Sequence, residues 1–137
     1  DGVPTYRGKY AFSRHFLGSD RVPAFDGKED GEEFKCAQIL DSMSEVEFWV
    51  RNVAQHPNSF WLPVAKGRTY PDFVAQLKDG RLLVIEYKGE HLVADSSEKR
   101  NIGILWQEAS KGKCVYVMAE KQRAGIDVKG QIRTCIS

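Results

Sequence analysis

Residues 70–88 read Tyr-Pro-Asp-Phe-Val-Ala-Gln-Leu-Lys-Asp-Gly-Arg-Leu-Leu-Val-Ile-Glu-Tyr-Lys. Two apolar runs flank a Lys-Asp-Gly turn at residues 78–80, and this pattern predicts a β-hairpin. Both runs carry apolar residues on both of their faces. We therefore expect the two strands to lie in the centre of a sheet, where neither face meets solvent.

Charged residues stand at the end of this hairpin opposite the turn. Pro71 and Asp72 precede the first apolar run, and Glu86 and Lys88 end the second. Side chains two residues apart on a strand share a face, so Glu86 and Lys88 point one way and Tyr87 points the other. The chemistry of this end depends on whether Asp72 joins them.

The turn decides the face on which Asp72 lies. A two-residue Asp-Gly loop would pair Asp72 with Tyr87, on the wrong face. A three-residue type I turn, with Gly80 left-handed and a bulge, instead places Asp72 opposite Glu86. We expect this second arrangement, with Pro71 limiting any further pairing.

Two carboxylates beside a backbone carbonyl suit a hard cation such as Mg²⁺, which prefers oxygen ligands and keeps several waters. The expected ligands are Asp72, Glu86 and the carbonyl of Tyr87. A protonated Lys88 cannot be a ligand; we expect it to hold or help deprotonate an attacking water and to offset transition-state charge. The alternative is that Glu86 and Lys88 are a strand end emerging into solvent and that Asp72 is a turn residue.

These residues resemble the active-site motif of the PD-(D/E)xK nuclease superfamily, which Asp72, Glu86 and Lys88 match residue by residue. More narrowly, the chain resembles the endonuclease domain at the C-terminal end of type III restriction enzyme Res subunits and related helicase-linked proteins. The further segments that carry this resemblance are Gly31–Ala37, Phe48–Asn52, Ser59–Pro63, Glu86–Leu92 and Glu98–Arg100. Together with the hairpin they span residues 31–119, and outside that span the match is loose.

The resemblance implies an endonuclease that hydrolyses DNA phosphodiester bonds with Mg²⁺, for which Mn²⁺ can substitute. The expected partners are DNA, a helicase or ATPase region of the same parent chain, and a methyltransferase subunit. The sequence contains no Gly-x-x-x-x-Gly-Lys-Ser/Thr phosphate loop, so an ATP-driven motor would lie outside these residues.

Two alternatives stay open. One is a non-catalytic module that binds DNA or a partner on a nuclease-like fold, and the other is a nuclease of another context, such as DNA repair. The intact Asp, Glu and Lys set argues against a pure binder, which has no need for two carboxylates where phosphates would sit.

The overall composition limits the remaining classes. The chain has 137 residues and a net charge of +1; this length fits one domain, and any DNA affinity must come from local patches. Three widely spaced cysteines without a Cys-x-x-Cys motif argue against a disulfide framework and a zinc site and favour a reducing compartment. With no apolar run of membrane-spanning length and no signal-peptide pattern, we expect a cytoplasmic protein without membrane contact.

Residues 1–27 are broken up by glycine and proline and predict an irregular lead-in to an endonuclease domain at 28–137. Basic and aromatic residues alternate in this lead-in, which suggests a DNA-facing surface with stacking rings. The alternative is a linker that packs its aromatic rings onto the domain. The residues concerned are Arg7, Lys9, Arg14, His15 and Arg21, interleaved with Tyr6, Tyr10, Phe12 and Phe16.

From Asp30 the apolar spacing becomes helical, and Glu32 and Glu33 fall near the edges of the buried face. In the resembled superfamily the first helix often supplies an acidic residue to the metal site. Glu33 is our candidate for an assisting carboxylate, with Glu32 close behind. The alternative is that both residues only favour the helix N-terminus electrostatically.

Residues 45–51 predict a strand with Val46, Phe48 and Val50 on its apolar face, and residues 60–64 predict a short second segment. Further along, residues 113–119 predict a buried strand. Residues 120–130 are expected to form a loop, and residues 127–136 a short terminal helix.

Between the hairpin and the strand at 113–119, residues 89–97 predict a loop and residues 97–110 a helix with Ile102, Leu105, Trp106 and Ala109 inward. Lys99 and Arg100 would lie in its first turn, against the usual preference for acidic residues there. They are candidates for DNA backbone contacts; ordinary solvated charge is the alternative.

The expected order of elements is helix, three strands, helix, strand. This order predicts an α/β sandwich with a restriction-endonuclease-like αβββαβ core, a mixed central sheet and helices on both faces.

Overall fold

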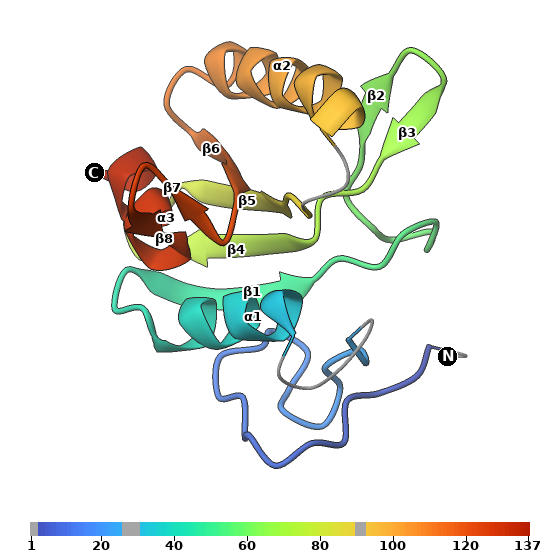
Figure 1. Cartoon of the computed structure of the whole chain (residues 1–137). Coiled ribbons are helices and arrows are strands. Elements are labelled where there is room, and N and C mark those ends of the chain that lie inside the picture. The colour runs from blue at the N-terminus through green and yellow to red at the C-terminus, as the bar shows by residue number, and fades with distance from the viewer. Residues whose placement is uncertain (1–2, 26–30, 90–92) are drawn as a thin grey trace.

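The computed structural model describes residues 3–25, 31–89 and 93–137, and these form an α/β fold around a mixed sheet (Figure 1). The sheet has the order β1-β4-β5-β6. Its strands are β1 (Val46–Arg51), β4 (Phe73–Leu77), β5 (Leu82–Tyr87) and β6 (Cys114–Ala119). β4 pairs antiparallel with both β1 and β5, whereas β6 runs parallel to β5. The predicted mixed sheet and the central position of the β4–β5 hairpin are confirmed.

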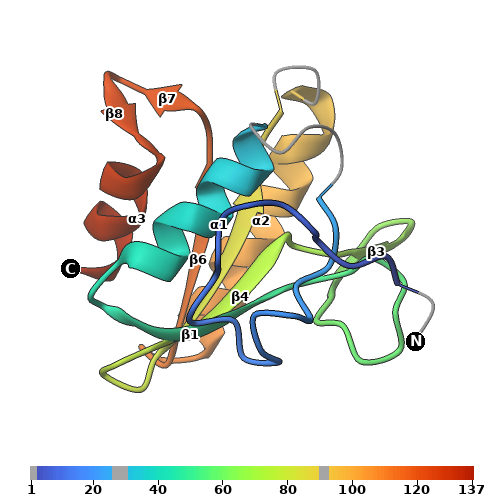
Figure 2. The same cartoon turned by 90° about the horizontal axis from the view of Figure 1, so that it is seen from below.

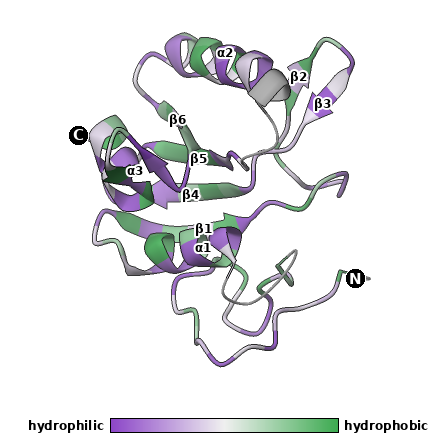
Figure 3. Cartoon of the chain, viewed as in Figure 1, coloured by the Kyte–Doolittle hydropathy of each residue, from purple (hydrophilic) through white to green (hydrophobic). Residues whose placement is uncertain are grey.

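Helices cover both faces of this sheet. Figures 1 and 2 show α1 (Glu32–Ser42) and α3 (Val128–Ile136) on one face and α2 (Val93–Ala109) on the other. Two buried apolar clusters lie between these layers, the larger under α1 and α3 and the smaller under α2. Figure 3 shows the corresponding hydrophobic residues along β1 and β5. No helix in the described part of the chain is long and apolar enough to cross a membrane.

The hairpin has the three-residue turn that the sequence predicts. The Leu77 N–H donates to the Arg81 carbonyl at 2.9 Å, and Gly80 adopts a φ of +95°. Phe73 pairs with Ile85. The next pair along the ladder is Asp72 opposite Glu86, so the predicted register is confirmed.

The predicted apolar face of β1 is wrong. A bulge shifts the register, because Val46 pairs with Leu77 but Phe48 pairs with Gln76. One extra residue in a strand moves all following side chains to the other face. Val46 and Trp49 are therefore both fully buried, and Phe48 is only half-buried.

α2 begins at Val93, not at residue 97, so the segment 93–96 predicted as loop is helical. The first turn, Val-Ala-Asp-Ser at residues 93–96, is too short to show the apolar period from which a helix is recognised. Lys99 and Arg100 consequently lie beyond the first turn. The expected conflict between these cations and the helix N-terminus is absent.

The buried face of α2 also differs from the prediction. Ile102 and Trp106 pack inward as expected, but Leu105 is 61% exposed and Ala109 is exposed as well. Gly103 faces the sheet instead: a Cβ added there would lie 2.3 Å from the ring of Tyr116. This close helix–sheet contact rotates Leu105 into solvent.

Two short hairpins lie outside the main sheet. β2 (Leu62–Val64) pairs with β3 (Gly67–Thr69), so residues 62–64 of the segment predicted at 60–64 form a strand, which does not extend the main sheet. β7 (Gln122–Arg123) pairs with β8 (Ile126–Asp127) within the region predicted as loop. The terminal helix is confirmed. Asp127 caps it by accepting a hydrogen bond from the Gly130 N–H.

The described part of the lead-in, residues 3–25, packs onto the domain. Phe12 is 1% exposed and makes edge-to-face contacts with Tyr6 and Trp49, with ring centroids 5.2 and 5.3 Å apart. The Arg14 guanidinium donates to the carbonyl of Val46 at 3.0 Å. These rings and this arginine are used inside the fold, as the linker alternative predicts, while Phe16 stays 63% exposed.

Candidate active site

The two carboxylates of the hairpin lie opposite each other at the end of β5. Hydrogen-bonded pairs alternate along an antiparallel ladder, and Leu77 bonds to Arg81, so Asp72 and Glu86 form a non-hydrogen-bonded pair. In such pairs the facing side chains come closest together. The Tyr87 backbone N–H donates to Asp72 Oδ2 at 2.7 Å, which fixes the carboxylate at the strand end.

Glu86 is only 8% exposed, and its two oxygens have different surroundings. Oε2 lies 3.4 Å from the ammonium of Lys99 on α2. Oε1 is buried and has no hydrogen-bond partner within the described residues. A buried carboxylate oxygen without a partner is costly, so this atom indicates a missing cation or donor.

Burial raises the pKa of Asp72 to about 8; the negative charges of Glu86 and Glu33 add to this effect, and the Tyr87 N–H and Arg51 oppose it. Burial also raises the pKa of Glu86, although Lys99 opposes the shift. Two neighbouring carboxylates in a poorly solvated site resist full ionisation together. The pair therefore favours the binding of either a proton or a metal cation.

Lys88 is the first residue after β5, and strand alternation would place its side chain on the same side as that of Glu86. Its backbone N–H donates to the Ala119 carbonyl at 2.7 Å, which keeps it beside β6. Its ammonium lies 3.8 Å from Glu120 Oε1 and therefore forms a loose ion pair with the residue that follows β6.

The two basic residues predicted on α2 both lie near the site. Lys99 contacts Glu86 directly, a contact that the sequence did not indicate. The charge of Arg100 helps to lower the pKa of Glu120, although the hydrogen bond from Arg123 is the largest cause. Both cations therefore border the carboxylates of this sheet end.

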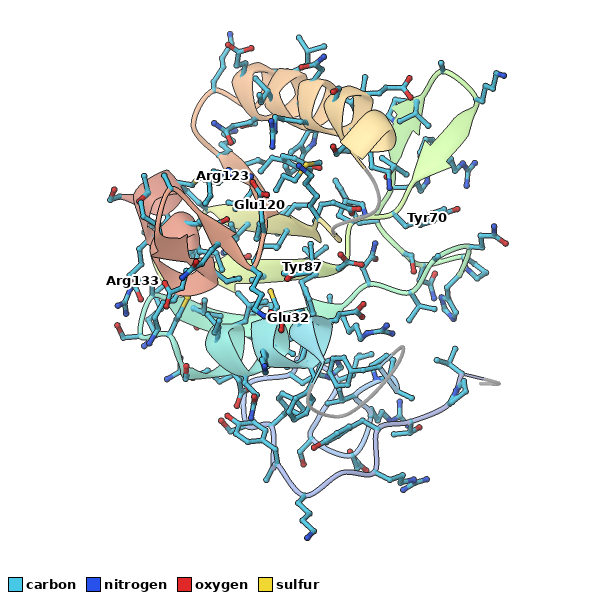
Figure 4. The ribbon with its side chains drawn as sticks, in the orientation of Figure 1. Glu32, Tyr70, Tyr87, Glu120, Arg123 and Arg133 are labelled. Atoms are coloured by element: carbon cyan, nitrogen blue, oxygen red, sulfur yellow. The ribbon has the colours of Figure 1, made fainter. Side chains whose placement is uncertain are left out.

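The acidic residues of α1 reach the sheet, but each has a partner of its own. Glu33 Oε1 accepts a hydrogen bond from Arg51 Nε at 2.7 Å. Glu32 accepts one from the Tyr87 hydroxyl at 3.3 Å, and Figure 4 shows these two side chains pointing toward each other. Across residues 3–25, 31–89 and 93–137, no three Asp, Glu, His or Cys side chains form a group that could hold a metal ion.

Asn52, to which the sequence analysis assigned no role, connects the segments around Phe60 and Asp72 through hydrogen bonds. Its side chain donates to the carbonyls of Phe60 and Pro71, both at 2.8 Å, and accepts from the Phe60 N–H at 2.9 Å. Its backbone N–H donates to the Asp72 carbonyl at 2.8 Å. Its place just after β1, in one of the segments that resemble the nuclease family, was the available signal.

A cavity of about 660 Å³ lies between the lead-in and residues 50–59, and Asn52 is among its lining residues. Arg21, Arg51 and His56 are among its lining residues. Of the basic residues predicted to face DNA from the lead-in, Arg21 thus borders this hollow, while His15 is buried.

The two facing carboxylates have the chemistry that suits a hard divalent cation, and no third ligand side chain joins them within the described residues. The site offers two carboxylates and a buried oxygen without a partner, and oxygen is the ligand that Mg²⁺ prefers. The chain matches no protein-family model, no curated protein and no solved structure. Its function therefore has to be inferred from the site itself.

Proposed function

We propose that this chain is a Mg²⁺-dependent endonuclease domain that hydrolyses DNA phosphodiester bonds, as the cleavage module of a type III restriction enzyme. The observation that carries the proposal is the facing pair of Asp72, which is half-buried, and Glu86, which is buried and has an oxygen without a partner. Lys88 lies two residues beyond Glu86, at the end of the same strand. Apart from the β2–β3 hairpin between β1 and β4, the elements follow the order helix, three strands, helix and strand through α1, β1, β4, β5, α2 and β6. This order is consistent with the restriction-endonuclease-like core that the resemblance implies.

Asp72, Glu86 and the Tyr87 carbonyl would hold the metal. The N–H and C=O of one residue in an antiparallel strand point to the same neighbouring strand. Because the Tyr87 N–H points to Asp72, its carbonyl is directed toward the same side. The bound ion would supply polarisation of a phosphoryl oxygen and of a water.

Lys88 would act on the nucleophile. Its ammonium has three N–H donors, and the loose contact with Glu120 leaves room to hold an attacking water or a phosphate oxygen. A positive charge at this place offsets the negative charge that develops in phosphodiester hydrolysis, an interaction made mainly in the transition state.

DNA would approach from the side of α2, with Lys99 and Arg100 contacting backbone phosphates. Glu33 would assist through its charge, which raises the pKa of both Asp72 and Glu86 and so favours a cation there. The proposed partners remain a helicase or ATPase region of the parent chain and a methyltransferase subunit, because the sequence contains no phosphate loop for an ATP-driven motor and the resembled restriction enzymes select their sites through other domains and subunits.

A non-catalytic binding module is the second candidate, and one observation favours it. The Lys99 ammonium already lies 3.4 Å from Glu86, so this carboxylate has a counterion within the chain. A protein without a metal would need such a pair to keep a buried carboxylate ionised.

A substitution of Lys88 distinguishes the nuclease from the non-catalytic binding module. In the full-length parent, on plasmid DNA with Mg²⁺ and the nucleotide that the parent requires, Lys88→Ala should lose at least about 10²-fold in cleavage rate. Metal binding and DNA affinity should stay near wild type. Lys78→Ala, in the exposed hairpin turn, is the control and should cut normally. A Lys88→Ala protein that cuts like wild type would overturn the catalytic assignment.

A further inference from the structure

Glu120 lies beside Lys88 because of the parallel pairing between β5 and β6. Tyr87 pairs with Ala119, so the next residue on each strand brings Lys88 and Glu120 together. The ammonium and Glu120 Oε1 are 3.8 Å apart, with the two side chains 19% and 29% exposed. The pair is thus partly shielded from water, which strengthens the attraction between its charges.

The backbone N–H and C=O of Glu120 are both hydrogen-bonded to a single buried side chain. Gln131 on α3 is 6% exposed. Its Oε1 accepts from the Glu120 N–H at 3.0 Å, and its Nε2 donates to the Glu120 carbonyl at 2.9 Å and to the Ile126 carbonyl at 2.9 Å. Both backbone groups of Glu120 are therefore fixed by the same amide.

The carboxylate of Glu120 is held from its other side by Arg123. Arg123 Nε donates to Glu120 Oε2 at 2.7 Å, and its Nη2 donates to the Met118 carbonyl at 2.8 Å. Figure 4 shows the two side chains close together beside β6. This contact occupies Oε2 and leaves Oε1 turned to Lys88.

Lys88 needs such a partner to act at a defined point. A lysine side chain has four flexible methylene groups and about 2 kcal/mol of rotamer entropy, so a strand-end lysine is poorly localised by itself. Catalytic groups lose much of their effect when they are misplaced by about 1 Å. A carboxylate that is fixed beside the ammonium limits the positions that the ammonium can occupy.

We infer that Glu120 is a positioning residue that holds the Lys88 ammonium in place at the sheet end where Asp72 and Glu86 lie. This inference rests on the proposed nuclease function. The separation of 3.8 Å exceeds hydrogen-bond length, so Glu120 orients Lys88 by charge and leaves its N–H groups for water or phosphate. Glu120 is held in place by the β7–β8 hairpin, through Arg123, and by α3, through Gln131.

A double-mutant cycle in the full-length parent tests the inference. Glu120→Gln should lower kcat by about 10-fold while KM and Mg²⁺ affinity stay unchanged, because Glu120 is expected to act only through Lys88. Glu120→Asp should recover part of the rate. In a Lys88→Ala background, Glu120→Gln should have no further effect. Wild-type kcat in Glu120→Gln, or losses that simply add, would overturn the inference.

A matched control comes from another carboxylate–arginine pair. Glu45 and Arg133 lie 2.9 Å apart with similarly accessible side chains, and neither belongs to the proposed site. Glu45→Gln should leave kcat unchanged. If Glu45→Gln lowered kcat as much as Glu120→Gln does, general destabilisation would explain both losses. That result would contradict a positioning role for Glu120.

A second measurement does not depend on cleavage. NMR relaxation of the lysine side chains should show a lower order parameter at Cε of Lys88 in Glu120→Gln, with Lys99 unchanged. If the parent protein does not cut DNA but Lys88 loosens in this way, the nuclease proposal fails while the contact is supported. If Lys88 keeps its order parameter, the positioning inference fails whatever the activity.

Discussion

The backbone N–H of Tyr87 donates a 2.7 Å hydrogen bond to the carboxylate of Asp72. The bond forms where the ladder between β4 and β5 ends, because Pro71 has no N–H with which to continue it. It joins the first acidic residue of the site to the strand that carries the second, Glu86. The separation of the two carboxylates is thus set by backbone geometry.

Mg²⁺ or Mn²⁺ should bind this pair and raise the melting temperature, because a cation offsets the repulsion between Asp72 and Glu86. Calorimetric titration at millimolar metal checks this. Asp72→Asn and Glu86→Gln should each lose most of the heat of binding. Asp79→Asn, in the exposed turn, should keep it. A wild-type chain that binds neither ion would rule out the metal site.

The contribution of Asp72 to the stability of the metal-free protein should fall as the pH rises from about 4 to about 8. Unfolded Asp72 loses its proton near its ordinary pKa of about 4, but the folded residue keeps it up to about 8. The folded state therefore binds more protons in this window, and the free energy of unfolding decreases with pH. Urea denaturation over this range should show a flatter profile for Asp72→Asn. Saturating Mg²⁺ should also flatten the dependence of the wild-type unfolding free energy on pH. Identical slopes for wild type, Asp72→Asn and Mg²⁺-bound wild type would contradict the raised pKa of Asp72.

DNA affinity should be modest and strongly dependent on salt, because the contacts are to phosphates and the net charge is only +1. Lys99→Ala and Arg100→Ala should each weaken binding regardless of sequence and reduce the slope of log K against log salt by about 1. Fluorescence anisotropy with Ca²⁺ in place of Mg²⁺ measures this without cleavage. Lys111→Ala, just beyond the far end of α2, is the control. A sequence-specific complex that survives high salt would place recognition within this domain.

Gly103→Ala should destabilise the protein by about 1–3 kcal/mol, because the new methyl would overlap the ring of Tyr116. In a helix without this contact, the same change would stabilise by about 1 kcal/mol. Gly89→Ala, where an added Cβ meets nothing within 4 Å, is the comparison. Chemical denaturation gives both values. Equal stability for Gly103→Ala and wild type would mean that α2 does not pack this closely.

Several features of the candidate site follow from local sequence. The Lys-Asp-Gly turn fixes the hairpin register, because Gly80 provides the positive φ that a three-residue turn requires. That register alone places Asp72 opposite Glu86. The mixed sheet and the helices on both faces follow from the apolar periods and the order of the elements.

Contacts between distant elements were decided by the tertiary structure. The contact of Lys99 with Glu86 depends on how α2 lies on the sheet, and Gly103 sets that packing. Glu33 was expected to assist the metal, and its side chain pairs with Arg51 on β1 instead of joining the carboxylates directly. No local period specifies which cation a helix carboxylate will meet.

The sequence by itself determined the residues of the hairpin site and the face on which each lies, because turn geometry and strand alternation act over a few neighbouring residues. Only the tertiary structure decided the bulge in β1 and the partner of Lys88. Both depend on pairing between strands that are distant in the chain. Glu120 reaches Lys88 because β6 runs parallel to β5 in a register set by core packing, for which the sequence carries no local signal.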